Sequence, residues 1–209
     1  MNIRKLFWIT TLLLSMGAVV SCSESDDEDA VNEFANWQQR NDAFFASLED
    51  SLKSNSSQWK KIKSYTKNEE TAGLPTEYIY AKVIESSYGS ASPLYSDSVR
   101  VAYRGRLIPT TTYPEGYVFE QTYVGNYSEE TAAVSDNTIS GFKDGFATAL
   151  QHMQKGDHWR VYMPYQLMYG ASTSGSIPAY SVLIFDMILI DFTSDGQSFY
   201  PWTSRKYNP

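Results

Sequence analysis

The first long pattern in the chain is an apolar stripe of helical period over residues 31–54. Asn55-Ser56-Ser57 ends this predicted helix, and Trp59 with Ile62 predicts a second short helical turn. The stripe either packs on its own domain or docks a partner. The candidate partner is a second copy of the chain, in a homodimer through this helix. Its apolar residues recur mostly at steps of three, four or seven: Phe34, Trp37, Phe44, Phe45, Leu48 and Leu52.

A period of two replaces the helical period from Tyr78 onward. Apolar and polar positions alternate over residues 78–83, 99–104 and 157–163, as in strands with one buried face. Residues 182–190 are nearly all apolar, as in a central strand that is covered on both faces. One short helix is expected between Phe146 and Met153, placed against the apolar face of the sheet. The pattern predicts an α+β fold: a curved antiparallel β-sheet wrapped around one short helix, with an N-terminal helical extension.

Residues 1–21 have the layout of a secretory signal. Arg4 and Lys5 precede an apolar run over residues 6–20, which is shorter than the roughly 20 apolar residues of a membrane span. The run ends at Val19-Val20-Ser21-Cys22, which resembles a bacterial lipobox, and Cys22 is the only cysteine of the chain. The resemblance implies that Cys22 is lipidated and becomes the new N-terminus. The alternative is an ordinary signal peptide followed by an uninvolved cysteine.

An acidic run follows this cysteine and is expected to form a tether over residues 22–30. Its five carboxylates repel one another and keep the segment solvated. Acids directly after a lipidated cysteine also resemble the surface-export signals of Bacteroidota lipoproteins. The protein is therefore expected in the cell envelope as an outer-membrane lipoprotein. Whether it faces the periplasm or the cell surface stays open.

Charge and composition exclude several classes of function. The net charge is -7, and removal of residues 1–21, which hold two basic and no acidic residues, leaves about -9. Nucleic acid is not an expected partner, because phosphate contacts need clustered basic side chains. A single cysteine allows no intramolecular disulfide, and His152 and His158 lack metal-ligand spacing. We therefore expect no metal and no cofactor, with His158 on the surface and His152 on a helix.

Six short segments between Asp97 and Phe192 carry the functional prediction. In this order, and with these gaps, they resemble the FKBP-type peptidyl-prolyl cis-trans isomerases over nearly half of the chain. The same half-roll fold is implied by the resemblance. The segments are Val99–Gly105, Gly116–Thr122, Gly145-Phe146, Met168-Tyr169-Gly170, Ile177-Pro178 and Leu183–Asp186.

The resemblance also implies a role for each site residue. The Tyr169 hydroxyl would donate to a substrate carbonyl, Glu120 would lie near the twisting amide, and Ile177 with Pro178 would close one side. Phe142 and Lys143 would belong to the segment whose backbone N–H holds a substrate carbonyl. The walls and floor for the proline ring would be Tyr103, Phe119, Phe146 and Phe185. As the alternative, the rings are core residues, Ile177 is a loop anchor, Tyr169 is a turn residue and Glu120 is a surface charge.

Three departures from the family pattern bear on catalytic rate. Phe146 stands where the family usually has tryptophan, and Glu120 stands where it usually has aspartate. The loop from Tyr123 to Asn137 has no confident match. A second pair, Gly141-Phe142, is an alternative floor, but the spacing from Phe146 to Met153 favours Gly145-Phe146.

The sequence thus predicts a peptidyl-prolyl isomerase that assists the folding of extracytoplasmic proteins by binding X-Pro segments. The alternative is a catalytically weak FKBP-like chaperone or peptide-binding module of the cell envelope. The expected partners are proline-containing polypeptides and, through the lipid anchor, a membrane. The predicted divisions are a signal peptide at 1–21, a tether at 22–30, a helical extension at 31–76, the isomerase domain at 77–193 and an aromatic tail at 194–209.

Overall fold

The computed structural model describes residues 32–87, 89–194 and 197–201. The predicted signal peptide, Cys22 and the acidic tether lie outside the described residues. Contacts divide the chain into residues 1–32 and 33–209, and the second unit holds every helix and strand described below.

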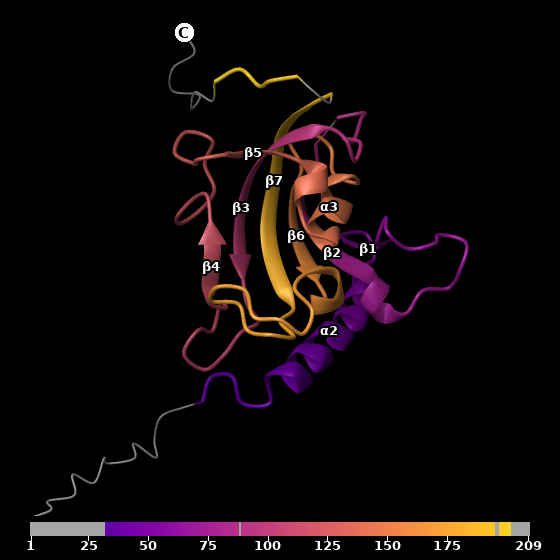
Figure 1. The fold of residues 1–209 in the computed structure, drawn as a ribbon, viewed down its shortest axis with the longest axis vertical. Coiled ribbons are helices and arrows are strands. Elements are labelled where there is room, and N and C mark those ends of the chain that lie inside the picture. Colours follow the sequence, from indigo (N-terminus) through magenta and orange to yellow (C-terminus); the bar gives the residue numbers. More distant parts are fainter. Residues whose placement is uncertain (1–31, 88, 195–196, 202–209) are drawn as a thin grey trace, which may run out of the picture. The chain divides into compact units, whose positions relative to one another are not determined.

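An antiparallel sheet dominates this unit (Figure 1). Its strand order is β1-β2-β6-β7-β3-β4, and β5 also pairs with β3. The long strand β7 lies at the centre between β6 and β3, as its nearly continuous apolar sequence predicted. The strands are β1 (Trp59–Lys63), β2 (Tyr78–Glu85), β3 (Ser98–Arg106), β4 (Val118–Gln121), β5 (Ser135–Thr138), β6 (His158–Met163) and β7 (Leu183–Thr193).

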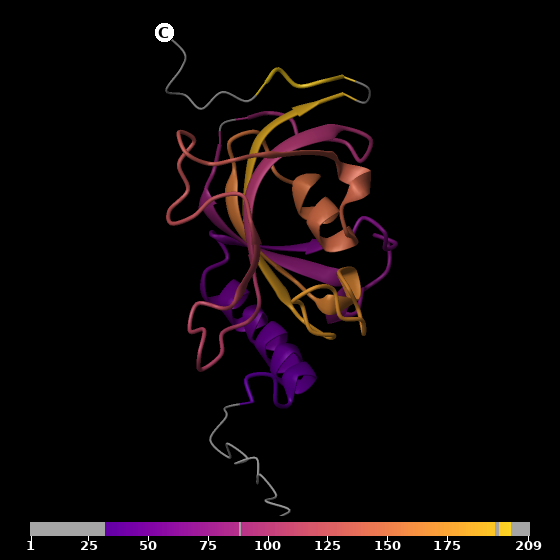
Figure 2. The ribbon, with the colours of Figure 1, turned by 60° about the vertical axis from the view of Figure 1, so that its left-hand side comes forward.

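The short helix α3 (Asp144–Leu150) lies within the curve of the sheet (Figure 2). All but its first residue are buried, because the helix packs its length against the concave face. Three single turns flank the strands, namely η1 (Pro75–Glu77), η2 (Ile139–Gly141) and η3 (Tyr165–Leu167). The apolar residues between α3 and the sheet form one continuous core.

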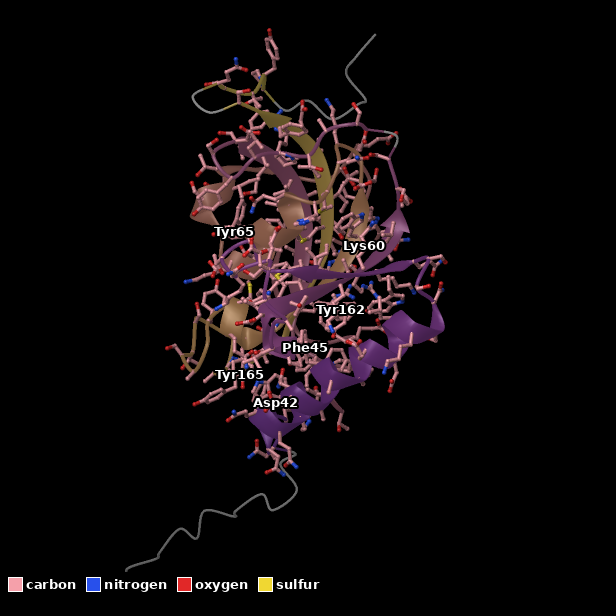
Figure 3. The ribbon with its side chains drawn as sticks, turned by 90° about the vertical axis from the view of Figure 1, so that its right-hand side faces the viewer. Asp42, Phe45, Lys60, Tyr65, Tyr162 and Tyr165 are labelled. Atoms are coloured by element: carbon pink, nitrogen blue, oxygen red, sulfur yellow. The ribbon has the colours of Figure 1, made fainter. Side chains whose placement is uncertain are left out.

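The N-terminal helix α2 (Trp37–Ser54) packs on the face of the sheet opposite α3, at the lower end of the sheet in Figure 2. Phe45 and Tyr162 lie between this helix and the strands (Figure 3). The Phe45 ring meets Tyr80 edge-on at 5.2 Å, and the Phe44 ring lies 6.2 Å from that of Tyr162. The stripe within α2 thus packs on its own domain, whereas Phe34, which precedes the helix, is 44% exposed.

Two polar bonds join α2 to the loop before β7. The indole nitrogen of Trp37 donates to Ser181 Oγ at 2.8 Å, and the buried Asn41 side chain accepts the backbone N–H of Val182 at 2.8 Å. Asn41 also donates to the carbonyl of Trp37 at 2.7 Å. Because every polar atom of the Asn41 amide is used inside the protein, α2 is an integral part of the domain.

Part of the sequence-based secondary structure is wrong. The second helical turn expected at Trp59–Ile62 is strand β1, which pairs with β2 at the edge of the sheet. The first helix begins at Trp37 and not at residue 31. The short strands β4 and β5 were not predicted as strands. The four strands predicted from alternating or apolar runs are confirmed as β2, β3, β6 and β7.

The described part of the C-terminal tail docks on β3. Arg100 donates through Nη1 to the carbonyl of Tyr200 at 2.8 Å and lies over the Phe199 ring at 4.6 Å. Trp202 and Tyr207, the other aromatic residues of the tail, lie outside the described residues. In the part of the chain that the structure describes, no helix has the length and apolar character to cross a membrane.

Candidate functional site

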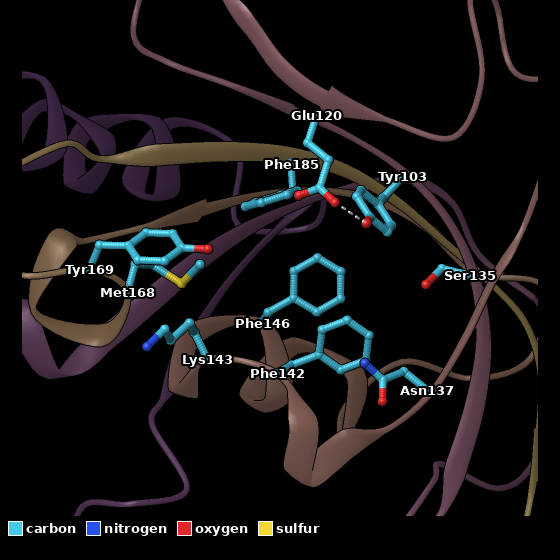
Figure 4. Close-up of a pocket in the computed structure, with 10 residues that line it drawn as sticks. All are labelled: Tyr103, Glu120, Ser135, Asn137, Phe142, Lys143, Phe146, Met168, Tyr169 and Phe185. Atoms are coloured by element: carbon cyan, nitrogen blue, oxygen red, sulfur yellow. Dashed lines mark hydrogen bonds between the residues drawn. The ribbon is translucent and has the colours of Figure 1, made fainter. Parts of the chain in front are cut away.

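Aromatic rings from three elements surround a hollow of about 290 Å³ between α3 and the sheet (Figure 4). The Phe146 ring forms its floor and is only 3% exposed. It meets Phe185 at 5.1 Å and Tyr103 at 5.6 Å, both edge-to-face, which is a favoured geometry for aromatic pairs. The strands β3 and β7 are neighbours, so the sheet holds the Tyr103 and Phe185 rings side by side.

A β-bulge brings two successive residues of β4 to this face. Glu120 lies opposite Gly105 and Val118 opposite Arg106, which leaves Phe119 as the extra residue. Neighbours in a regular strand point to opposite faces, and a bulge re-aims one of them. The Phe119 ring therefore packs 5.5 Å from Phe185 while Glu120 also reaches the pocket.

Gly105 leaves the space that two of these rings occupy. A Cβ atom at this position would lie 2.5 Å from Phe119 Cζ and 2.7 Å from Phe185 Cε1. Any larger residue would displace both rings, so the glycine on β3 shapes the wall of the pocket.

One hydrogen bond sets the electrostatics of the upper wall. The Tyr103 hydroxyl donates to Glu120 Oε1 at 2.7 Å. Burial, together with the bond to the carboxylate, raises the pKa of Tyr103, so the phenol stays protonated and keeps donating. The Glu120 carboxylate is thereby oriented beside the hollow.

The start of α3 supplies the lower wall. The Phe142 ring stacks on Phe146 at 4.6 Å and an interplanar angle of 19°. Its backbone N–H donates to the carbonyl of Ile139, whereas no acceptor for the N–H of Lys143 lies in the described part of the chain. Of the two predicted N–H groups, that of Lys143 is the one open to a ligand. Gly145 permits the close approach of Met163 and Met168, whose atoms would lie 3.1–3.2 Å from a Cβ there.

Tyr169 forms the rim opposite β5, and its hydroxyl points into the hollow (Figure 4). This hydroxyl has no hydrogen-bond partner among the described residues, and Lys143 Nζ lies 5.3 Å from the centroid of its ring. A phenol that is unpaired and directed inward can donate to a ligand that enters.

Ile177 and Pro178 do not line the hollow. Ile177 is 6% exposed and pairs with Ser174 in a small bridge, so it anchors the loop. The carbonyl of Pro178 accepts a bond of 2.7 Å from Ser181 Oγ, the same oxygen that accepts from Trp37. Helix α2 thereby holds the loop that follows the Tyr169 rim.

The structure brings seven of the ten predicted pocket residues to the lining. Phe119 packs against Phe185 without lining the hollow, and Ile177 and Pro178 lie in the loop before β7. Sequence reasoning missed Ser135 and Asn137, because the position of β5 depends on its pairing with β3. It also missed Met168, although this residue directly precedes Tyr169. The seven are Tyr103, Glu120, Phe142, Lys143, Phe146, Tyr169 and Phe185.

The lining suits the binding of an apolar ring held by a few polar groups. It offers one carboxylate, one lysine, one side-chain amide and two tyrosine hydroxyls, and Ser135 has no histidine beside it in the lining that would activate it as a nucleophile. Within the described residues, no three His, Cys, Asp or Glu side chains gather as ligands of a metal ion would.

A protein-family model and several curated proteins match about half of the chain. Residues 89–190 match the family model of the FKBP-type peptidyl-prolyl cis-trans isomerases. The chain is 33% identical over 125 residues to the macrophage infectivity potentiator of Trypanosoma cruzi, covering 59% of this chain and 57% of that protein. It is 36% identical over 118 residues to the outer membrane protein MIP of Legionella longbeachae, covering 56% and 45%. The chain thus spans about half the length of these relatives.

A solved structure shares the architecture. The peptidyl-prolyl cis-trans isomerase from Pseudomonas syringae superposes with a TM-score of 0.55 at 21% identity, covering 77% of this chain and 96% of that one. At this identity the likeness concerns the fold alone. The predicted fold, a curved antiparallel sheet around one short helix with an N-terminal helical extension, is confirmed.

Proposed function

We propose, on the premise that residues 89–190 form a domain of the FKBP-type peptidyl-prolyl cis-trans isomerase family, that the protein binds X-Pro segments and speeds rotation about the bond before proline. The observation that carries the proposal is the ring-walled hollow over Phe146. It is apolar where a proline ring would enter and polar at the rim.

The physical reason lies in the amide bond itself. Resonance makes the peptide bond planar, with a rotation barrier of about 18–20 kcal/mol. Rotation breaks this resonance, and the twisted state is less polar than the planar state. A hollow that removes water from the bond therefore favours the twisted state, which is catalysis by differential binding. A 1000-fold acceleration needs only about 4 kcal/mol.

Three polar groups are suited to hold the substrate while it turns. The inward hydroxyl of Tyr169 and the backbone N–H of Lys143 are donors for carbonyl groups on either side of the proline. The Glu120 carboxylate, held by Tyr103 at 2.7 Å, lies beside the hollow where the amide would twist. The described lining supports this division between apolar walls and polar rim.

The function is tested by the refolding of a protein whose slow phase is limited by prolyl isomerisation. The purified protein, added in catalytic amounts, is expected to shorten this phase without changing the final yield. An improved yield with an unchanged slow phase would contradict the isomerase and leave the alternative, an FKBP-like binding module. The smaller floor at Phe146 is the feature that keeps this alternative open.

Replacing Tyr169 with phenylalanine is expected to lower kcat/KM for an X-Pro peptide by about tenfold, because one hydrogen bond to the substrate is lost. The ring and its place on the rim remain, so thermal unfolding should not change. Tyr165→Phe, in the nearby η3 turn, removes a hydroxyl outside the lining and serves as the control. Equal kcat/KM in Tyr169→Phe and wild type would remove this hydroxyl from the site.

The location is proposed to be the cell envelope, with a lipid on Cys22. The lipobox-like Val19-Val20-Ser21-Cys22 and the acidic run after it support this proposal, and a relative carries the name outer membrane protein. Cys22→Ser is expected to abolish incorporation of a labelled fatty acid and to shift the protein from the membrane fraction to the soluble fraction. Wild-type protein that takes up no label would contradict the lipid anchor.

A further inference from the structure

A second hollow lies on the face of the sheet that points away from the aromatic pocket. Side chains alternate along a strand, so Arg104 and Asp186 turn away from the side to which their neighbours Tyr103 and Phe185 point. The hollow has a volume of about 170 Å³ and is lined on its sheet side mainly by charged residues. The pocket described above does not use any of these side chains.

Three arginines and one carboxylate line this hollow. Arg104, Asp186 and Arg160 form one row across β3, β7 and β6. Arg160 binds both oxygens of Asp186, through Nε at 2.7 Å and Nη2 at 3.1 Å. Arg106 lies two residues beyond Arg104 on β3, with Nη1 3.8 Å from Asp186 Oδ2. The Asp186 side chain is only 9% exposed, and its charge is compensated by the bidentate pair with Arg160.

The loop after β4 closes over the same hollow. Arg104 donates through Nη2 to the backbone carbonyls of Tyr123 at 3.0 Å and Gly125 at 2.7 Å. Its guanidinium also lies 4.5 Å from the centroid of the Tyr123 ring. These contacts hold the loop and the Arg104 side chain in place. The hollow therefore lies between the sheet on one side and this loop on the other.

The charges in the hollow do not balance. Among the residues that line the hollow, three guanidinium groups, which stay charged at any physiological pH, face one carboxylate, so the lining carries an excess of two positive charges. His158 adds no charge at neutral pH, because burial lowers its pKa; it is half-buried, although the sequence predicted a surface residue. Two carboxylates outside the lining offset part of this excess: that of Glu85 acts by charge on His158, and that of Glu115 acts by charge on Arg160. The excess stands out in a chain with a net charge of -7.

A donor in the hollow also lacks an acceptor. The Nε atom of Arg106 is buried and has no hydrogen-bond partner among the described residues. Buried donors of this kind are rarely left unpaired, because their loss of hydration is not compensated. An oxygen atom of a bound anion would supply the missing acceptor.

We propose that this arginine pocket binds a doubly charged oxyanion group, the phosphate or sulfate ester of a ligand. Two negative charges match the excess of two positive charges in the lining, whereas a carboxylate supplies only one. Guanidinium groups pair with such oxygens through parallel N–H bonds. The hollow is smaller than the roughly 300–1,000 Å³ of sites for whole drug-sized ligands, so it takes the charged group and leaves the remainder of the ligand outside. The proposal does not depend on isomerase activity.

The test is a titration of the purified protein at low ionic strength with inorganic phosphate, followed by NMR. Saturable shifts are expected at the Arg106 Nε–H and at the backbone amide of Gly125. Sodium sulfate should give the same shifts, and sodium acetate at equal ionic strength should bind at least about tenfold more weakly. Saturation by phosphate alone, or by sulfate alone, supports the proposal and identifies the ester.

Two variants and a control distinguish binding at this site from nonspecific electrostatic attraction of the anion. Arg106→Gln is expected to raise the phosphate Kd by about tenfold or more, which corresponds to the loss of a charge-assisted hydrogen bond. Arg106→Lys keeps the charge but loses the fork, and should bind with intermediate affinity. Lys53→Gln removes an exposed charge from α2 and should leave the Kd unchanged. Non-saturating shifts, equal affinity for acetate, or an equal Kd in a folded Arg106→Gln variant would overturn the proposal.

Discussion

Replacing Phe146 with alanine is expected to lower kcat/KM for an X-Pro peptide by about 100-fold, equal to roughly 2.7 kcal/mol of transition-state stabilisation. The ring is the floor of the hollow and touches the rings of Phe142, Tyr103 and Phe185. Without it, water enters beneath the proline and the preference for the twisted amide is lost. The same change should destabilise the fold by about 3–5 kcal/mol, because the ring is 3% exposed.

A matched control separates these two effects. Leu150 lies on the same helix, is fully buried and does not line the hollow. Leu150→Ala should therefore lose about 2–5 kcal/mol of stability and keep most of its activity at a temperature where both variants are folded. If a folded Phe146→Ala variant retained wild-type kcat/KM, the aromatic hollow would not be the catalytic site.

Replacing Asn41 with alanine is expected to destabilise the domain by about 2–3 kcal/mol. The change leaves the buried N–H of Val182 without an acceptor and the Trp37 carbonyl without the side-chain donor. For a protein of this size, the melting temperature should fall by roughly 5–10 °C in a calorimetric or circular-dichroism scan.

The control for this prediction is on the same helix. Gln39→Ala replaces an exposed side chain of α2 and should change the melting temperature little. Equal melting temperatures of Asn41→Ala and Gln39→Ala would mean that α2 does not hold the loop before β7. A lower temperature for Asn41→Ala alone supports α2 as part of the domain.

The parts of the fold that could be predicted are those with long, regular patterns. The strands β2, β3, β6 and β7 follow from alternating or continuous apolar runs. The segment Trp59–Lys63 was misread as helical because Trp59 and Ile62 lie three residues apart, a step that fits a helical turn. In the sheet, Lys61 pairs with Glu49 at 2.8 Å and lies over the Tyr80 ring at 5.5 Å. Long-range contacts of this kind are not visible in a local sequence pattern.

The candidate site likewise has a part that could be predicted and a part that could not. The order of the motifs predicted that Tyr103, Phe146 and Phe185 share one pocket, since each motif lies on a regular element. The polar rim from Ser135 and Asn137 could not be predicted, because a four-residue polar strand has no apolar signal and is placed by pairing with β3. The pairing of Glu120 with Gly105, and with it the position of Phe119, also depends on a β-bulge, which has no signature in this sequence.

The arginine pocket shows what a family resemblance leaves out. Arg104 lies within the segment Val99–Gly105, whereas Arg106 and Arg160 lie outside the six segments, and the resemblance gives a role to none of the three arginines. Their convergence on Asp186 follows only from the register of β3, β6 and β7. One sheet thus carries an aromatic hollow on one face and a cationic hollow on the other.

The central claim is that the ring-walled hollow favours a prolyl bond caught between its cis and trans forms. Its most direct test is NMR exchange spectroscopy of a short X-Pro peptide with micromolar protein. We predict exchange cross-peaks between the two isomers with wild type and Leu150→Ala, and catalysed exchange about 100-fold slower with Phe146→Ala. Wild-type protein that gives the exchange rate of the free peptide would contradict the account.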